Sequence, residues 1–122
     1  MLNQVVVVGR LVSDPTVKEN ENGAKVSNIT LAVPRSYKNE NGEYDTDFVD
    51  CTLWGGICEN ACEYCHKGDL LGVKGRIQTG NYEKDGEKRK STQIVAEKIT
   101  FLSSSKTHEQ DNDLNQDDDL EV

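Results

Sequence analysis

The stretch Asp47–Lys67, DFVDCTLWGGICENACEYCHK, joins a strand pattern directly to a helix pattern. Apolar and polar residues alternate from Asp47 to Trp54, which is typical of a strand with one buried face. The pair Gly55-Gly56 then ends the strand, and apolar residues recur at helical spacing over Ile57–Lys67, with Gly68 as the expected helix stop. The residues expected on the buried face of the strand are Val49, Cys51 and Leu53. A strand that leads into one short helix indicates a small β-rich domain.

The sequence on either side of this stretch predicts further strands. Three dipeptides can take the positive φ values of two-residue hairpin turns, namely Asn22-Gly23, Asn41-Gly42 and Asp85-Gly86. The strands expected around them are Gln4–Val12, a short arm at Val17–Glu19, Ala24–Val33, Asp69–Thr79 and Ser91–Leu102. The valine run in the first strand is typical of a strand buried on both faces, and Pro34 predicts weaker pairing after the third of these segments.

The order of these elements predicts the fold class. Three long strands, a helix and two more strands, with Gly72 and Gly75 in the fourth long strand, fit an all-β, five-stranded Greek-key barrel of the OB type, with its one small helix between strands 3 and 4. The alternative is another small β-rich domain. Residues 1–103 are expected to form this domain. Residues 104–122 are rich in Ser, Asn, Gln and Asp, which predicts a disordered acidic tail.

The net charge of −8 has an uneven distribution along the chain. Residues 1–106 contain 14 basic and 15 acidic side chains, whereas residues 107–122 contain seven acidic side chains and no Lys or Arg. The acidity therefore belongs to the tail and does not exclude a nucleic-acid partner for the domain. The longest apolar run, Val5–Val8, is far shorter than the roughly 20 residues that span a bilayer, so no membrane partner is expected. The start of the chain does not resemble a secretion signal, which predicts a cytoplasmic location.

Two large rings lie on the face of the Asp47–Trp54 strand that points away from the expected core. Phe48 and Trp54 should therefore be exposed unless a partner covers them. Two more accessible rings are expected. Tyr37 lies beyond the end of the preceding strand, and Tyr82 lies in the long charged hairpin that joins the last two strands and has Asp85-Gly86 at its tip. Unpaired bases stack on such side chains with little sequence preference. The competing interpretation is that these rings close a barrel end or contact another subunit.

Cations accompany the four rings, as a path for nucleic-acid phosphates requires. They lie on the first and fourth strands, beside Tyr37 and in the hairpin around Tyr82. The candidate phosphate contacts are Arg10, Arg35, Lys38, Lys74, Arg76, Lys84, Lys88 and Arg89, with Lys90 next to them. The competing interpretation is a solvated charged surface.

The spacing of Cys58, Cys62 and Cys65, followed by His66, is compatible with a metal or iron–sulfur site. The same spacing coincides with the apolar stripe of the predicted helix, and free cysteine is among the most frequently buried residues. Core packing is therefore the preferred interpretation, and no metal or cofactor is expected. The sequence also lacks the GxSxG, GxxxxGK[ST] and HExxH motifs, so a binding protein is favoured over an enzyme.

Several segments in one order resemble the bacterial single-stranded DNA-binding protein family, which has chromosomal, plasmid and phage members. They are MLNQVVVVGRLVSDP from Met1, NITLAVPRSY from Asn28, DFVDCTLWG from Asp47 and KGDLLGVKGRIQTGNYE from Lys67. The resemblance implies an OB-fold homotetramer that wraps single-stranded DNA in replication, recombination and repair, at the nucleoid. The family's base-stacking aromatics fall on Tyr37, Phe48, Trp54 and Tyr82, and its phosphate contacts fall on the cations named above.

The sequence departs from this family in two places. Glycine stands at positions 55, 56 and 80, where the family usually or often has basic residues. This departure keeps open an alternative function, an OB-fold interaction or assembly module with weak or lost DNA binding. In the family, an acidic tail that ends in Pro and Phe binds replication and repair proteins. Here Asp117, Asp118, Asp119 and Leu120 match that tail, but the chain ends Glu121-Val122.

Overall fold

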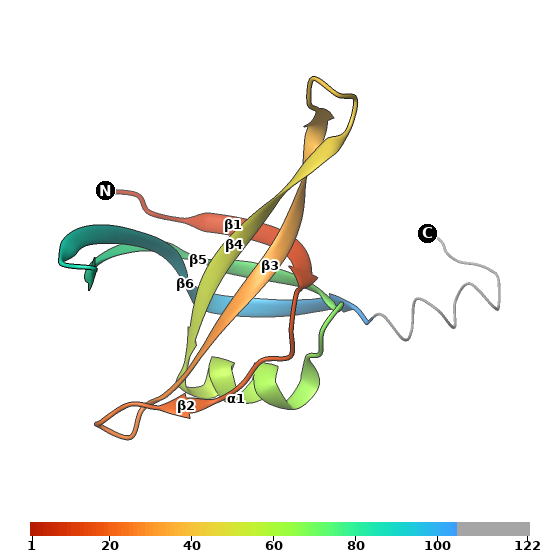
Figure 1. The fold of residues 1–122 in the computed structure, drawn as a ribbon. Helices are drawn as coiled ribbons and strands as arrows, with labels where there is room; N and C mark the ends of the chain where they lie inside the picture. Colours follow the sequence, from red (N-terminus) through yellow and green to blue (C-terminus); the bar gives the residue numbers. More distant parts are fainter. Residues whose placement is uncertain (105–122) are drawn as a thin grey trace.

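A computed structural model describes residues 1–104 of the chain as six strands and one helix (Figure 1). The elements are β1 (Val5–Leu11), β2 (Lys18–Glu19), β3 (Lys25–Lys38), β4 (Tyr44–Trp54), α1 (Gly55–Tyr64), β5 (Leu70–Lys84) and β6 (Glu87–Ser103). The predicted tail beyond Ser104, including Asp117, Asp118, Asp119 and Leu120, lies outside the described residues. Within residues 1–104, no helix has the length and apolar character needed to cross a membrane.

The five long strands close into a barrel, which confirms the predicted OB fold. They follow the order β1-β5-β6-β4-β3, and β3 returns to β1 at Arg10 and Leu11. All of these pairings are antiparallel except that of β4 with β6, which is parallel and covers only Cys51 and Thr52 on the β4 side. Helix α1 lies between the third and fourth barrel strands, as predicted, and β2 is a short addition at the edge of β3.

The core fills the barrel with the inward-facing residues of every long strand. Leu31 and Leu53 are completely buried, as the alternation in their strands predicts, and Leu71 and Val73 of β5 lie against them. Helix α1 covers one end of the barrel (Figure 1) and contributes Cys58 and Ala61 to the core. The barrel is therefore closed at the helix end.

Gly75 lets β5 approach β6 more closely than any other residue could. The pairing of these strands shifts register here, because Lys74 faces Lys98 whereas Gly75 faces Ala96. A Cβ at position 75 would overlap the carbonyl oxygen of Val95 and lie 2.9 Å from its carbonyl carbon and 3.1 Å from Ala96 Cα. All three atoms belong to the backbone of β6, so a larger side chain cannot be accommodated by a rotamer change.

Strand β1 is not buried on both faces, contrary to the expectation from its valine run. Its residues alternate, and the side chains of Val6 and Val8 are 68% and 47% exposed. They face outward because the barrel packs only the inner face of β1. The described part of the chain provides no cover for the outer face.

Helix α1 starts and ends earlier than predicted. It begins at Gly55, which adopts a φ of 59°, and ends at Tyr64, so Cys65 is in an extended conformation although it is buried. Two side-chain carboxylates explain the early end. The backbone N–H of His66 donates to Asp69 Oδ2 at 2.8 Å and that of Lys67 donates to Asp14 Oδ1 at 2.7 Å, so neither can continue the helix.

The three predicted turns are present, but only Asp85-Gly86 is a two-residue hairpin turn. Both of its residues have positive φ, and Lys84 pairs with Glu87 directly across it. The other two turns are three-residue loops that end in Gly23 and Gly42. In each loop an Asn side chain, Asn20 or Asn39, accepts two backbone N–H groups, which favours the longer form.

The hairpins β3–β4 and β5–β6 extend beyond the barrel as two arms (Figure 1). Strand β3 continues past Pro34 to Lys38, with an irregular register between these residues that agrees with the predicted weakening. Strands β5 and β6 stay paired to the Asp85-Gly86 turn. The arms exceed the predicted strands because both of their faces meet solvent and leave no hydropathy pattern.

Candidate nucleic-acid interface

The outer face of β4 presents two large exposed rings. Phe48 is 66% exposed and Trp54 is 43% exposed, while Cys51 and Leu53 of the same strand are buried. The alternation of a strand places Phe48 and Trp54 on one face, six residues or about 20 Å apart. The structure thus brings these two predicted site residues together on one surface, which we call the ring face.

Polar side chains fill the ring face between Phe48 and Trp54. The Thr30 hydroxyl of β3 donates to Asp50 Oδ1 at 2.8 Å. The Thr52 hydroxyl donates to Gln93 Oε1 of β6 at 2.7 Å and lies 3.2 Å from Asn28 Oδ1 of β3. These bonds span three adjacent strands and hold the surface between the rings rigid. They also leave one carboxylate, Asp50, exposed on the path between the rings.

A hollow of about 300 Å³ adjoins the ring of Phe48. Apolar residues such as Val5, Val49 and Ile94 line it together with Gln93 and Asp50. Its volume lies at the low end of the roughly 300–1,000 Å³ that small-molecule sites enclose. Flat apolar groups with polar edges, such as nucleobases, match this combination of lining residues.

On the β3–β4 arm, Arg35 is engaged by carboxylates. Its Nη2 donates to Asp47 Oδ1 at 2.8 Å and its Nε to Asp47 Oδ2 at 3.1 Å, and Asp45 lies 3.8 Å from its Nη1. The hydrogen bond from Arg35 lowers the pKa of Asp47, and the same pair raises the pKa of the guanidinium. Asp47 therefore competes with a phosphate for the Arg35 guanidinium.

The sequence predicted that Tyr37 lies beyond the end of a strand, but the structure places it within β3. Its side chain is 63% exposed. The next residue, Lys38, pairs with Tyr44 of β4, and its Nζ lies 5.9 Å from the centroid of the Tyr44 ring. The sequence interpretation missed Tyr44, which is 57% exposed. The signal was available, because Tyr44 continues the alternation that places Phe48 on the outer face.

The β5–β6 arm carries Tyr82 and three of the candidate cations, Lys84, Lys88 and Arg89. Tyr82 is 49% exposed and faces Arg89 across the ladder, and a hollow of about 310 Å³ lies between Tyr82 and Lys88. Acidic residues alternate with the cations here. Lys84 faces Glu87, Lys88 faces Glu83, and Arg89 Nη2 is 3.3 Å from Glu87 Oε2.

The three barrel cations lie in separate places. Arg10 is in register with Ala32, which is in register with Phe48, but its Nη1 donates to the Gly68 carbonyl at 2.9 Å. Arg76 donates to Gln78 Oε1 at 2.9 Å and lies 3.9 Å from Glu97. Lys74 is in register with Val6 and Lys98, on the β1 side of β5.

The cysteines belong to the core, as predicted. Cys51, Cys58 and Cys65 are buried and Cys62 is half-buried against them. Burial raises the pKa of Cys51 to about 11 and also raises the pKa values of Cys58 and Cys65. In the part of the chain that the structure describes, no three His, Cys, Asp or Glu side chains are grouped to hold a metal ion.

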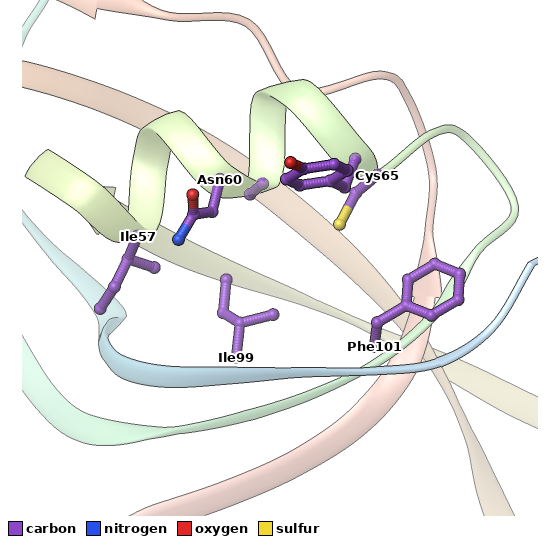
Figure 2. A pocket seen from close by; sticks show the side chains of 7 residues that line it. Ile57, Asn60, Cys65, Ile99 and Phe101 are labelled. Carbon is purple, nitrogen blue, oxygen red and sulfur yellow. The ribbon is translucent and has the colours of Figure 1, made fainter.

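A hollow between α1 and β6 lies at the helix end of the barrel (Figure 2). It measures about 170 Å³, and the side chains of Ile57, Ile99 and Phe101 line it with the sulfur of Cys65. Burial raises the pKa of the Cys65 thiol, which disfavours the reactive thiolate form.

Comparison with known proteins gives a consistent result. Residues 2–102 match the model of the single-strand binding protein family. Single-stranded DNA-binding protein B of Bacillus subtilis is 48% identical over 103 residues, which are 84% of this chain and 91% of that protein. The single-stranded DNA-binding protein of Bacillus cereus is 45% identical, and single-stranded DNA-binding protein 2 of Listeria innocua is 47% identical, each over 84% of this chain. The matches cover 61% and 65% of these two longer relatives.

Proposed function

The chain belongs to the single-strand binding protein family, and on that premise we propose that it coats and protects single-stranded DNA in replication, recombination and repair. One observation carries the proposal, the exposure of Phe48 and Trp54 on one face of β4. Residues 1–103 act as the binding domain and residues 104–122 as an acidic tail. Like its family, the chain is a binding protein rather than an enzyme. Its place of action is the nucleoid, where single-stranded DNA arises.

Binding combines two interactions on this surface. Bases stack on Phe48 and Trp54, and on Tyr37 and Tyr82 of the arms, because every base has a face that fits an aromatic ring. Phosphates are neutralised by nearby cations, with release of condensed counterions. The cations that serve this role are Arg10, Arg35, Lys38, Lys74, Arg76, Lys84, Lys88 and Arg89. Stacking carries the larger share at the ring face, because Asp50 is there and Arg35 is paired with Asp47.

The test uses Trp54, the only tryptophan in the chain. Titration with a 35-residue oligo(dT) at low salt should quench its fluorescence. Phe48→Ala should weaken binding by about 1–3 kcal/mol. Phe101→Ala is the matched control, since Phe101 is also half-exposed but lines the hollow beside α1. Unquenched fluorescence together with no retention of the oligonucleotide would remove the proposal.

We also propose that the protein is a homotetramer. The exposed valines of β1, Val6 and Val8, support this, because contiguous exposed apolar groups mark association surfaces. Within residues 1–104, β3 pairs with β1 only at Arg10 and Leu11, so Val5–Val8 offers a free strand edge to another copy. Sedimentation equilibrium should give a particle mass four times that of the chain. The substitution Val6→Lys should lower this particle mass. A monomer at micromolar concentration would contradict the proposal.

The runner-up function is an interaction module with weak DNA binding, and the carboxylates beside Phe48 and Arg35 are the observation in its favour. Capture of replication or repair proteins without DNA retention would support it. In the leading proposal, such partners bind through Asp117, Asp118, Asp119 and Leu120 of the tail. Deletion of residues 107–122 should then abolish their capture, while single-stranded DNA is still bound.

A further inference from the structure

Tyr44 is an exposed ring on β4 that neither the sequence pattern nor the family resemblance assigned to the interface. Its side chain is 57% exposed, although it belongs to a ladder that pairs Tyr44 with Lys38. Within the described residues, its one recorded ring contact is with the Lys38 ammonium group. The ring does not contribute to the core of the barrel, so its position needs another explanation.

The geometry of β4 aligns Tyr44 with the two rings of the ring face. Residues 44, 48 and 54 are separated by even numbers, and alternate residues of a strand share a face. At about 3.3 Å per residue, Tyr44 lies about 13 Å from Phe48 along the strand. Phe48 therefore stands between Tyr44 and Trp54 on the same face. The β3–β4 arm, which carries Tyr44, extends away from the barrel (Figure 1).

Lys38 supplies a cation beside this ring. Its Nζ is 5.9 Å from the Tyr44 centroid, within the distance at which a cation interacts with an aromatic face. No ion pair of Lys38 is recorded in residues 1–104, whereas Arg35 on the same strand is held by Asp47 and Asp45. Lys38 is therefore better placed than Arg35 to contact a phosphate without first giving up a carboxylate.

We propose that Tyr44 is an additional base-stacking residue and that Lys38 contacts the phosphate next to that base. This inference rests on the proposed function and extends it, because it continues the DNA path from Phe48 onto the β3–β4 arm. The bound group is an unpaired nucleotide of any sequence. Tyr44 continues the line of rings from Phe48 along β4, whereas Tyr37 lies in the stretch of β3 where the register with β4 is irregular.

The experiment measures binding of the 35-residue oligo(dT) through quenching of Trp54 fluorescence. Tyr44→Ala should raise the dissociation constant about 5- to 150-fold, which corresponds to the loss of one stacked base. Tyr44→Phe keeps the ring and should bind within about twofold of the unmodified protein. Tyr64→Ala is the matched control, because Tyr64 is 65% exposed but lies on α1. A plot of the logarithm of the binding constant against the logarithm of the salt concentration has a negative slope. Lys38→Gln should make this slope less steep by about 0.7.

A second measurement reports on the position itself. In a chain that carries Trp54→Phe and Tyr44→Trp, oligo(dT) should quench the fluorescence of the relocated indole. Unchanged affinity of Tyr44→Ala, equal weakening by Tyr44→Phe, or an unquenched indole at position 44 would each overturn the inference. In all three cases quenching of Trp54 in the unmodified protein would still uphold the proposed function, whereas its absence would remove both.

Discussion

Replacement of Gly75 by alanine tests the closest approach between strands in the barrel. The added Cβ would overlap the Val95 carbonyl oxygen and crowd the backbone of Ala96, so β5 must move away from β6 at the register shift. Overpacking of a core costs about 1–3 kcal/mol when side chains can adjust. Here the obstacle is backbone, so we expect the upper end of that range. Alanine also lowers the conformational entropy of the unfolded chain, which offsets about 0.4–1 kcal/mol of this loss in stability. The net loss should be about 2–3 kcal/mol.

The assay is urea unfolding followed by Trp54 fluorescence, at one protein concentration because association shifts the apparent stability. With a slope of about 1–3 kcal/mol/M, the Gly75→Ala midpoint should fall by about 1 M or more. Gly80→Ala in the same strand is the control, since the nearest atom to its Cβ is the Ser91 hydroxyl oxygen at 3.4 Å. Equal midpoints for the two variants would refute the steric argument.

Three further predictions concern charge and thiol chemistry. Asp50→Asn keeps an acceptor for the Thr30 hydroxyl and removes a charge from the DNA path. Affinity for DNA at low salt should rise roughly threefold, as expected for a charge about 7 Å from a phosphate in water. Unchanged affinity in the same fluorescence titration would contradict this. Deletion of residues 107–122 removes seven carboxylates and should tighten DNA binding at low salt but not at high salt; equal affinities at low salt would show that the tail does not compete. A thiol reagent such as DTNB should modify half-buried Cys62 first. Buried Cys51, with its pKa raised to about 11, should react only on unfolding. Absorbance of the released chromophore, combined with peptide mapping, gives the order of modification, and any other order would contradict this prediction.

The barrel could be predicted from the sequence because one face of each central strand is buried. In β4 the alternation around Cys51 and Leu53 identified the core face and, by difference, the exposed rings Phe48 and Trp54. The order of strands and helix then selected the OB topology. Local hydropathy is sufficient where burial decides the structure.

The remaining features depend on partners that lie far away in the sequence. Helix α1 ends at Tyr64, although the apolar pattern continues to Cys65, because the N–H of Lys67 is taken by Asp14, 53 residues away, and that of His66 by the nearby Asp69. The valines of β1 indicate two apolar faces, but hydropathy does not say whether the same chain or another copy covers the second. Arg35 could be predicted as a cation, but its pairing with Asp47 follows only from the β3–β4 register.

The pairing of β1 with β5 has a consequence for how the chain acquires its structure during synthesis. Val5 pairs with Gly75, so 70 residues separate two partners that must meet to close the barrel. The hairpins β3–β4 and β5–β6 join near neighbours, and such local contacts form early, whereas distant pairings form slowly. At about 5–20 residues per second, a ribosome needs roughly 4–14 s to make the segment between Val5 and Gly75. For that interval the valines of β1 lack their β5 partner, so this apolar segment of the nascent chain stays unpaired.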